Sequence, residues 1–348
     1  MTRQTGDAYP MALQRKLVLF LIPVLIALTC YSCATAPPQA EKVPELYWPL
    51  PPEKPRIKFV DIILGNLDVS TKASMLRNFV FGAQEDGRFI KPYGVTARNN
   101  VMYVTDITAV HVFDFGNGRF SVIGRNELKS PAGIAVTSDR AYVADVATKK
   151  IYVYDLQGQF KMDFGAKDIA VPAGLALDEK RGRLIISDSK KHCVHVYDLN
   201  GIKLFSFGQR GAALGEFNIP YGVAVDKEGR IYVVDGMNFR LQVFNEKGVF
   251  LKSFGEIGTS PGSFARPKAV ALDSDGHVYV LDSSFSNFQI FDYDGNTLLS
   301  VGTNGSDPGE FLLPSSIAID EHDKIYVVDQ INKRVQIFQY LRDQQQDR

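Results

Sequence analysis

A proline followed by a short apolar run recurs six times along the chain. Successive prolines lie 39, 41, 48, 47 and 47 residues apart, and they are Pro92, Pro131, Pro172, Pro220, Pro267 and Pro314. Internal periods of about 40 to 50 residues are typical of propellers. Each period holds four short β-branched or aromatic runs bounded by turn residues, such as 222–226, 231–235, 240–245 and 251–255. The sequence therefore predicts an all-β, six-bladed β-propeller with four antiparallel strands per blade.

The last three units share one loop design. Counted from Gly208, Gly255 and Gly302, glycine recurs at offsets 3 and 7, phenylalanine at offset 9 and proline at offset 12. We expect the three phenylalanines to pack between blades. Glycine before an inner strand allows the close backbone approach that a crowded axis requires.

Composition is consistent with one all-β domain. Hydrophobic residues make up 45% of the chain, and glycine and proline are frequent, with 29 and 17 copies. Radially arranged repeats share hydrophobic cores with their neighbours, so we assign residues 56–340 to a single propeller. The body of the chain holds one cysteine, Cys193, which excludes a disulfide within the fold.

The N-terminal region has the pattern of an export signal. Arg15 and Lys16 precede an apolar run at 17–28, and this run is short for a membrane span. We interpret residues 1–33 as a signal peptide resembling that of bacterial lipoproteins, with Cys30 or Cys33 lipidated. Simple secretion and an uncleaved anchor are the alternatives. The expected location is the bacterial cell envelope, on a membrane facing the periplasm.

Three further segments lie outside the six repeats. Residues 34–55 are rich in proline and predict a semi-rigid tether, on which Tyr47 and Trp48 are expected to dock against the domain. A short helix is expected at about 70–82, inserted before the first blade. Residues 341–348 are polar and are expected to form a disordered tail.

Ring closure is expected to involve an N-terminal strand. Residues 57–63 alternate like a strand, whereas the sixth unit stops after its third strand. An unpaired sheet edge invites association with other chains. We therefore expect 57–63 to complete the last blade by pairing with 335–339.

The repeated residues resemble the NHL-repeat family of six-bladed propellers. The resemblance rests on the pattern Asp-x-x-Asn-x-Arg-x-Gln, which begins at Asp235 and again at Asp329, together with the Gly-x-Phe-x-x-Pro loops. The first three units depart from this pattern. An aspartate ends each second strand, and we expect it to accept backbone N–H bonds from nearby loops.

Antiparallel strand order places the four-to-one links and the two-to-three loops of all blades on one face. That face is expected to be cationic and aromatic, and to bind an envelope protein or an acidic or glycan ligand. The candidate binding residues are Lys91, Tyr93, Tyr221, Asn238, Arg240, Arg266, Lys268, Asn332 and Arg334. Nucleic acid is not an expected partner, because an exported protein meets little of it.

A catalytic role is the alternative hypothesis. Several six-bladed relatives are metal-dependent hydrolases or lyases with Ca²⁺ or Zn²⁺ on the axis, where carboxylate, asparagine or histidine ligands converge. In this chain the starts of the inner strands carry no such set, and the five histidines are scattered. We therefore assign no catalytic residue, metal site or cofactor. The preferred function is a non-catalytic binding or scaffolding propeller, with a metal-dependent hydrolase or lyase as the alternative and a sensor subunit of an envelope complex as a third.

Overall fold

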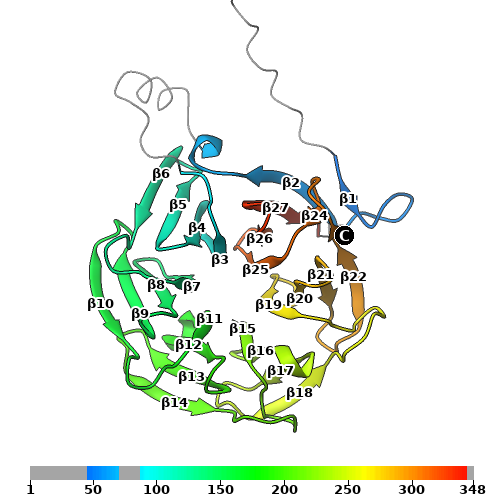
Figure 1. The fold of residues 1–348 in the computed structure, drawn as a ribbon. Helices are drawn as coiled ribbons and strands as arrows, with labels where there is room; N and C mark the ends of the chain where they lie inside the picture. The colour runs from blue at the N-terminus through cyan, green and yellow to red at the C-terminus, as the bar shows by residue number, and fades with distance from the viewer. Residues whose placement is uncertain (1–44, 70–86, 343–348) are drawn as a thin grey trace, which may run out of the picture. The chain divides into compact units, whose positions relative to one another are not determined.

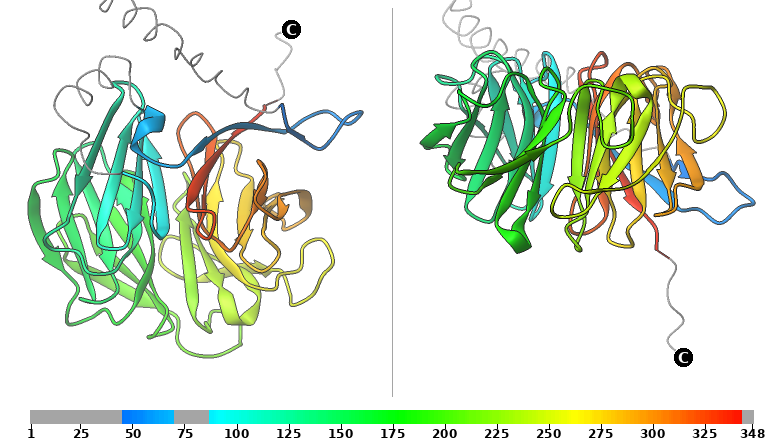
Figure 2. Two further views of the ribbon diagram at one scale, coloured as in Figure 1. Left: turned by 45° about the horizontal axis from the view of Figure 1, so that its top comes forward. Right: turned by 90° about the horizontal axis from the view of Figure 1, so that it is seen from below.

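The computed structural model describes residues 45–69 and 87–342. Six antiparallel sheets surround a central axis, as Figure 1 shows. Figure 2 shows from the side that the strands run between two loop-bearing faces. The predicted helix at 70–82, the signal segment with Cys30 and Cys33, and the tail beyond residue 342 lie outside the described residues. Within the described part of the chain, no helix has the length and hydropathy that a membrane span needs.

Each blade follows the predicted four-strand order. Blade one comprises β3 (Pro92–Arg98), β4 (Val101–Asp106), β5 (Ala109–Asp114) and β6 (Arg119–Ile123). Blade two comprises β7 (Pro131–Val136), β8 (Arg140–Asp145), β9 (Lys150–Asp155) and β10 (Phe160–Phe164). Blade three comprises β11 (Pro172–Asp178), β12 (Arg183–Asp188), β13 (Cys193–Asp198) and β14 (Lys203–Phe207). Blade four comprises β15 (Pro220–Val225), β16 (Ile231–Asp235), β17 (Arg240–Phe244) and β18 (Phe250–Phe254). Blade five comprises β19 (Pro267–Leu272), β20 (Val278–Asp282), β21 (Asn287–Phe291) and β22 (Thr297–Val301). The last repeat contributes β25 (Pro314–Ile319), β26 (Lys324–Asp329) and β27 (Arg334–Tyr340) to blade six. The shorter elements are β1 (Tyr47–Trp48), β23 (Thr303–Asn304), β24 (Glu310–Phe311) and the 3₁₀ turns η2 (Asn66–Val69), η3 (Glu179–Arg181) and η4 (Gly236–Asn238).

The hydrophobic core lies between neighbouring blades. All five residues of β16 are buried, whereas the outer strand β10 is buried only at Phe164. Phe217 has no exposed surface and packs with Val196 of blade three and Val233 of blade four. Phe264 and Phe311 are equally buried, so the expected packing of these phenylalanines between blades is confirmed.

The inner strands approach each other closely at the axis. A Cβ atom on Gly94 would lie 2.2 Å from the carbonyl oxygen of Ala132, and one on Gly222 would lie 2.6 Å from Cα of Ala269. A side chain at either position would push adjacent blades apart. The glycines near the start of the inner strands therefore set the narrow diameter of the channel.

The aspartates that end the second strands tie the blades to their loops. The carboxylate of Asp145 accepts backbone N–H bonds from Lys129, Ser130 and Thr148, at 2.6, 2.7 and 2.9 Å. Asp282 accepts equivalent bonds from Ala265, Arg266 and the loop that follows it. The structural role expected of these aspartates is confirmed.

The strand β2 (Ile57–Ile63) lies beside the last repeat. It pairs antiparallel with β27, with Ile57 opposite Tyr340 and Ile63 opposite Val335, and β1 extends the same sheet. Trp48 of β1 packs edge-on against Phe338 at 5.7 Å between ring centroids. This sheet therefore joins residues from both ends of the described chain (Figure 1).

Candidate functional site

We call the face formed by the four-to-one links and the two-to-three loops the upper mouth, and the opposite face the lower mouth. The upper mouth contains a small axial pocket of about 70 Å³. It is lined by the residues that begin the inner strands: Tyr93, Gly94, Val95, Gly133, Ile134, Ala173, Gly174, Leu175, Tyr221, Gly222, Val223, Lys268, Ala269, Val270, Ser315, Ser316 and Ile317. Six segments distant in sequence thus meet at one point.

Lys268 is the only charged residue among the described residues that line this pocket. Its Nζ atom lies 3.4 Å from the centroid of the Tyr221 ring, a cation–π contact. Burial and, to a smaller extent, the nearby Arg266 guanidinium lower the pKa of the Lys268 ammonium to about 8. Both effects disfavour the charged form, so an incoming anion would relieve them.

Tyr93 lies in the same pocket. Burial raises the pKa of its phenol, Tyr221 adds to this effect, and the positive charge of Arg266 opposes it. Tyr93, Tyr221, Arg266 and Lys268 therefore form one electrostatically coupled group. The structure brings together these four of the nine candidate binding residues.

The serine and threonine hydroxyls around the pocket hold the ring together. Ser315 donates to the carbonyl oxygen of Tyr93 at 2.7 Å, and Thr105 donates to that of Ala132 at 2.9 Å. Ser187 donates to the carbonyl oxygen of Tyr221. These contacts link neighbouring blades. Besides Ser316, whose hydroxyl accepts a bond from the N–H of Val95, the polar side chains left in the lining are the lysine and the two tyrosines.

The described lining does not fit an axial metal ion. Ca²⁺ and Zn²⁺ require converging carboxylate, amide, imidazole or thiolate ligands. The lining contains none of these side chains, and the one charged side chain that it offers is the cation Lys268. Elsewhere in the described chain, no three histidine, cysteine, aspartate or glutamate side chains are grouped as metal ligands would be.

Arg240 and Arg334, both candidate binding residues, occupy internal contacts. Arg240 Nε donates to Asp235 Oδ2 at 2.8 Å, and its Nη2 donates to the carbonyl oxygens of Ala213 and Glu216. Arg334 makes the same ion pair with Asp329 at 2.7 Å. Both guanidinium groups therefore clamp the glycine-rich loop that precedes their own blade.

Asn238 and Asn332 belong to the same clamps. Their amide groups donate to the carbonyl oxygens of Gly211 and Gly305 at 2.9 and 3.0 Å. Gln242 completes the first clamp, accepting from the N–H of Gly215 and donating to the carbonyl oxygen of Glu216. The Asp-x-x-Asn-x-Arg-x-Gln spacing, which the sequence already displayed, is the signal of this loop clamp. Lys91 stands apart from the clamps, exposed on blade one beside Pro92.

In blade three, a cysteine and a histidine stand at the positions that the arginine and the glutamine of the clamp occupy in blade four. His195 Nε2 lies 3.5 Å from Asp188 Oδ2 and 3.6 Å from Cys193 Sγ, and His195 Nδ1 bonds to Ser206. Burial raises the pKa of the Cys193 thiol to about 11. Cys193 is therefore a protonated, buried thiol and not a nucleophile.

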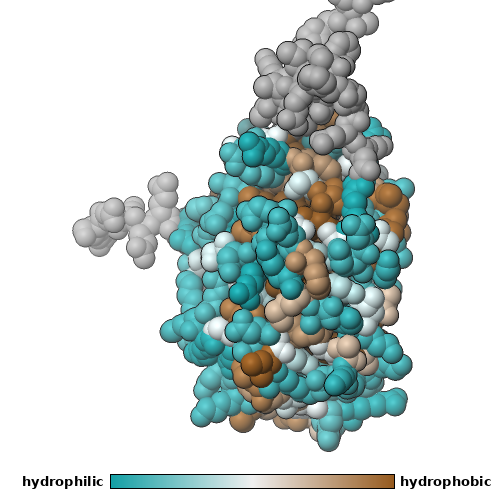
Figure 3. Space-filling view, turned by 90° about the vertical axis from the view of Figure 1, so that its left-hand side faces the viewer, coloured by the Kyte–Doolittle hydropathy of each residue, from teal (hydrophilic) through white to brown (hydrophobic). Residues whose placement is uncertain are grey.

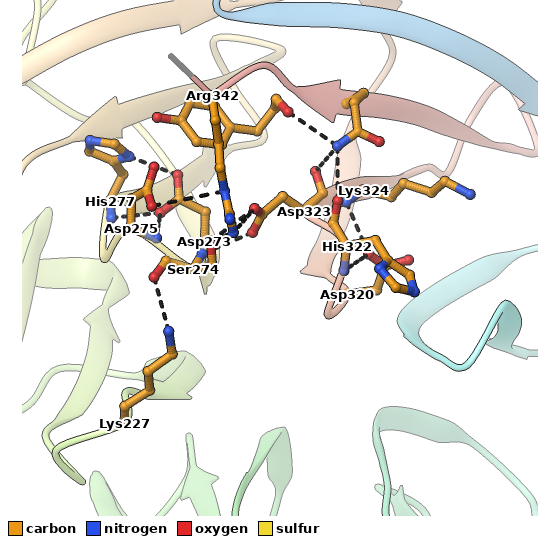
Figure 4. A network of polar contacts seen from close by, with 12 residues as sticks. Lys227, Asp273, Ser274, Asp275, His277, Asp320, His322, Asp323, Lys324 and Arg342 are labelled. Carbon is orange, nitrogen blue, oxygen red and sulfur yellow. Dashed lines mark hydrogen bonds and ion pairs between the residues drawn. The ribbon is translucent and has the colours of Figure 1, made fainter. Parts of the chain in front are cut away.

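The side chains of the lower mouth include several aspartates, in contrast to the lining of the Lys268 pocket. Figure 4 shows Arg342 extending between the one-to-two turns of blades five and six, where it contacts Asp323 at 2.6 Å. Asp323 also accepts two hydrogen bonds from Ser274, and Asp273 pairs with His277 at 2.7 Å. The lower mouth has an axial pocket of its own, of about 250 Å³, but the one charged residue in its described lining is an acid, Glu179.

Comparisons with known proteins agree with this architecture. A family model described as a 6-bladed β-propeller matches residues 269–344. The chain is 33% identical over 140 residues to the Drosophila melanogaster protein brain tumor, a match that covers 37% of this chain and 13% of that protein. It thus spans a small part of that relative's length.

Two solved structures share the fold. An auxiliary nutrient binding protein from Bacteroides thetaiotaomicron superimposes with a TM-score of 0.59 at 15% identity, covering 74% of this chain and 70% of that one. A gluconolactonase from Xanthomonas campestris superimposes with a TM-score of 0.55 at 15% identity, covering 73% and 87%.

A second family model, for the SMP-30/gluconolactonase/LRE-like region, matches residues 59–260, which is more than half of the chain. The chain therefore belongs to the SMP-30/gluconolactonase/LRE-like family, as a six-bladed β-propeller with NHL-type repeats.

Proposed function

We propose that this protein is a non-catalytic binding module whose upper mouth holds an acidic group of a protein or glycan partner. The observation that carries the proposal is the axial pocket, in which a partly buried ammonium, Lys268, stands on an aromatic platform beside a second cation, Arg266. A desolvated cation binds an anion more strongly than an exposed one does.

A hydrolase is the second candidate function because of the family to which the chain belongs. The family description includes gluconolactonase, and one similar fold is a gluconolactonase. The lining of the described pocket argues against a metal-dependent reaction at the axis, because it offers a lysine instead of metal ligands. The similar fold of the auxiliary nutrient binding protein supports the binding role.

The proposal includes export and a lipid anchor at Cys30 or Cys33. It rests on the N-terminal sequence pattern, since these residues lie outside the described part of the chain. Mass spectrometry of the mature N-terminus from a bacterial envelope tests it. A diacylglyceryl-modified cysteine is expected, and an unmodified secreted N-terminus would contradict it.

The binding function is tested by calorimetric titration of a glutamate-rich peptide into the native protein and three variants. Lys268→Glu and Arg266→Glu should each weaken binding at least tenfold, because each reverses a charge at the mouth. Lys252→Glu, a matched reversal on the outer wall next to Asp294, should leave binding unchanged. Hydrolysis of sugar lactones that depends on added Ca²⁺ or Zn²⁺, with no peptide binding, would favour the hydrolase.

A further inference from the structure

Exposed aliphatic side chains are concentrated on the upper mouth. On blades six and one, the structure exposes Ile90 at 62%, Ile331 at 57%, Ile107 at 46% and Leu313 at 38%. Among the described one-to-two turns that rim the lower mouth, no large hydrophobic side chain is exposed to this degree. Figure 3 shows the wall of outer strands on the β6 and β10 side, where hydrophobic residues are scattered among hydrophilic ones. The three-to-four turns of the lower mouth do expose Ile202 at 63% and Val249 at 58%, but these two residues stand singly on separate blades.

The loops that carry these four residues are joined by hydrogen bonds over blades six and one, and we call the four side chains the aliphatic rim. The backbone N–H of Ile90 donates to Asp106, the residue before Ile107, at 2.7 Å. The N–H of Ile331 donates to the carbonyl oxygen of Leu312, the residue before Leu313, at 3.2 Å. Gln330 joins the two blades by donating to the carbonyl oxygen of Pro92 at 3.2 Å.

Cations border this rim on both sides. Arg266 and Lys268 lie on blade five, and the exposed Lys91 follows Ile90 on blade one. The nearby carboxylates of Asp106 and Asp282 are buried and accept backbone N–H bonds. We call the surface formed by Arg266, Lys268, Leu313, Ile331, Ile90, Lys91 and Ile107 the cation–aliphatic arc.

The inner strands approach each other closely around the pocket, so a carboxylate at Lys268 places the rest of a larger ligand over the surrounding loops. Over blades six and one the surface of these loops is branched and aliphatic, which suits the leucine, isoleucine and valine side chains of a protein.

We propose that the cation–aliphatic arc binds a polypeptide segment in which acidic residues flank aliphatic ones. One carboxylate enters the axial pocket at Lys268, the aliphatic side chains cover Leu313, Ile331, Ile90 and Ile107, and a second carboxylate reaches Lys91. This inference rests on the proposed binding function and selects a protein partner over a glycan or a small acid.

The test uses the full chain and two fluorescein-labelled peptides that differ only in the two residues between their glutamates. One peptide has a Glu-Leu-Ile-Glu core and the other a Glu-Ser-Ser-Glu core. The double variant Ile107→Ser with Ile331→Ser removes the aliphatic rim. The matched control is Val249→Ser with Leu251→Ser on blade four, whose exposed fractions of 58% and 45% nearly equal those of the test pair.

Fluorescence anisotropy should show the Glu-Leu-Ile-Glu peptide binding at least tenfold more tightly than the Glu-Ser-Ser-Glu peptide. The rim variant should abolish this difference, and the control variant should preserve it. Equal binding of both peptides, or tighter binding of an oligogalacturonate, would overturn the inference while leaving the anion site intact. Failure of every anionic probe, with no effect of Lys268→Glu, would instead overturn the proposed function itself.

Discussion

At the scale of single residues, Lys268 is the group on which the proposed anion binding depends. Burial lowers the pKa of its ammonium to about 8, against an ordinary value of 10.5. The ¹³Cε resonance of Lys268 should therefore titrate near pH 8, and a bound acidic peptide should raise that midpoint because the carboxylate favours the charged form. A midpoint above 10 without ligand would contradict this assignment.

The same pKa shift has a definite effect on stability. Between pH 8 and about 10.5 the unfolded chain binds more protons at Lys268 than the native protein does, so this group makes stability rise with pH in that window. The rise should amount to about 1–2 kcal/mol, and Lys268→Met should lack it. Urea unfolding at pH 7.5 and pH 10 measures the difference. Identical pH dependence in both proteins would show that Lys268 is not desolvated.

Asp235 provides the second residue-scale prediction. It is fully buried and accepts bonds from Arg240, Asn238, Gln242 and the backbone of Asn218. Asp235→Ala leaves a nearly buried guanidinium without its carboxylate and should cost about 3–5 kcal/mol. Asp294→Ala, which breaks an exposed ion pair with Lys252, should cost less than about 1 kcal/mol. Chemical denaturation would refute the clamp if the two variants were equally stable.

At the scale of structural elements, the loop clamp should act locally. Gln242 holds both the N–H of Gly215 and the carbonyl oxygen of Glu216. Gln242→Leu should therefore speed amide hydrogen exchange at least tenfold in the loop 208–217 and little elsewhere. Gln209→Leu removes an exposed bond to Glu216 within the same loop and is the control. Equal exchange in the two variants would argue against the clamp.

The repeat period and the proline and glycine positions were sufficient to predict the blades, because each blade is built from local hairpins. Strand parity predicts which loops share the upper mouth, and Tyr93, Tyr221 and Lys268 line the axial pocket there, with Arg266 close to Lys268. The inner contacts of Arg240 were not anticipated. They depend on its register opposite Asp235 and on a loop about 25 residues earlier. Linear spacing also hides the pocket volume, which depends on six distant segments.

At the scale of the whole molecule, the strand β2 should determine the integrity of the ring. It buries Ile57, Phe59 and Ile63 and covers the edge of β27. A chain beginning at Leu64 should lose at least about 5 kcal/mol relative to one beginning at Glu45, and should self-associate through the open edge. Thermal unfolding and light scattering measure both effects. A stable monomer beginning at Leu64 would show that β2 is dispensable.

The proposed function requires that the upper mouth hold an anion at Lys268 and not a metal ion. The most direct measurement is calorimetry on metal-free native protein and its Lys268→Ala variant, titrated separately with the glutamate-rich peptide, Ca²⁺ and Zn²⁺. If Lys268 holds the anion, the native protein should bind the peptide, the variant should bind it at least tenfold more weakly, and neither should take up a metal ion at one per molecule. Stoichiometric, micromolar metal binding by the native protein, with peptide affinity unchanged in the variant, would contradict this requirement.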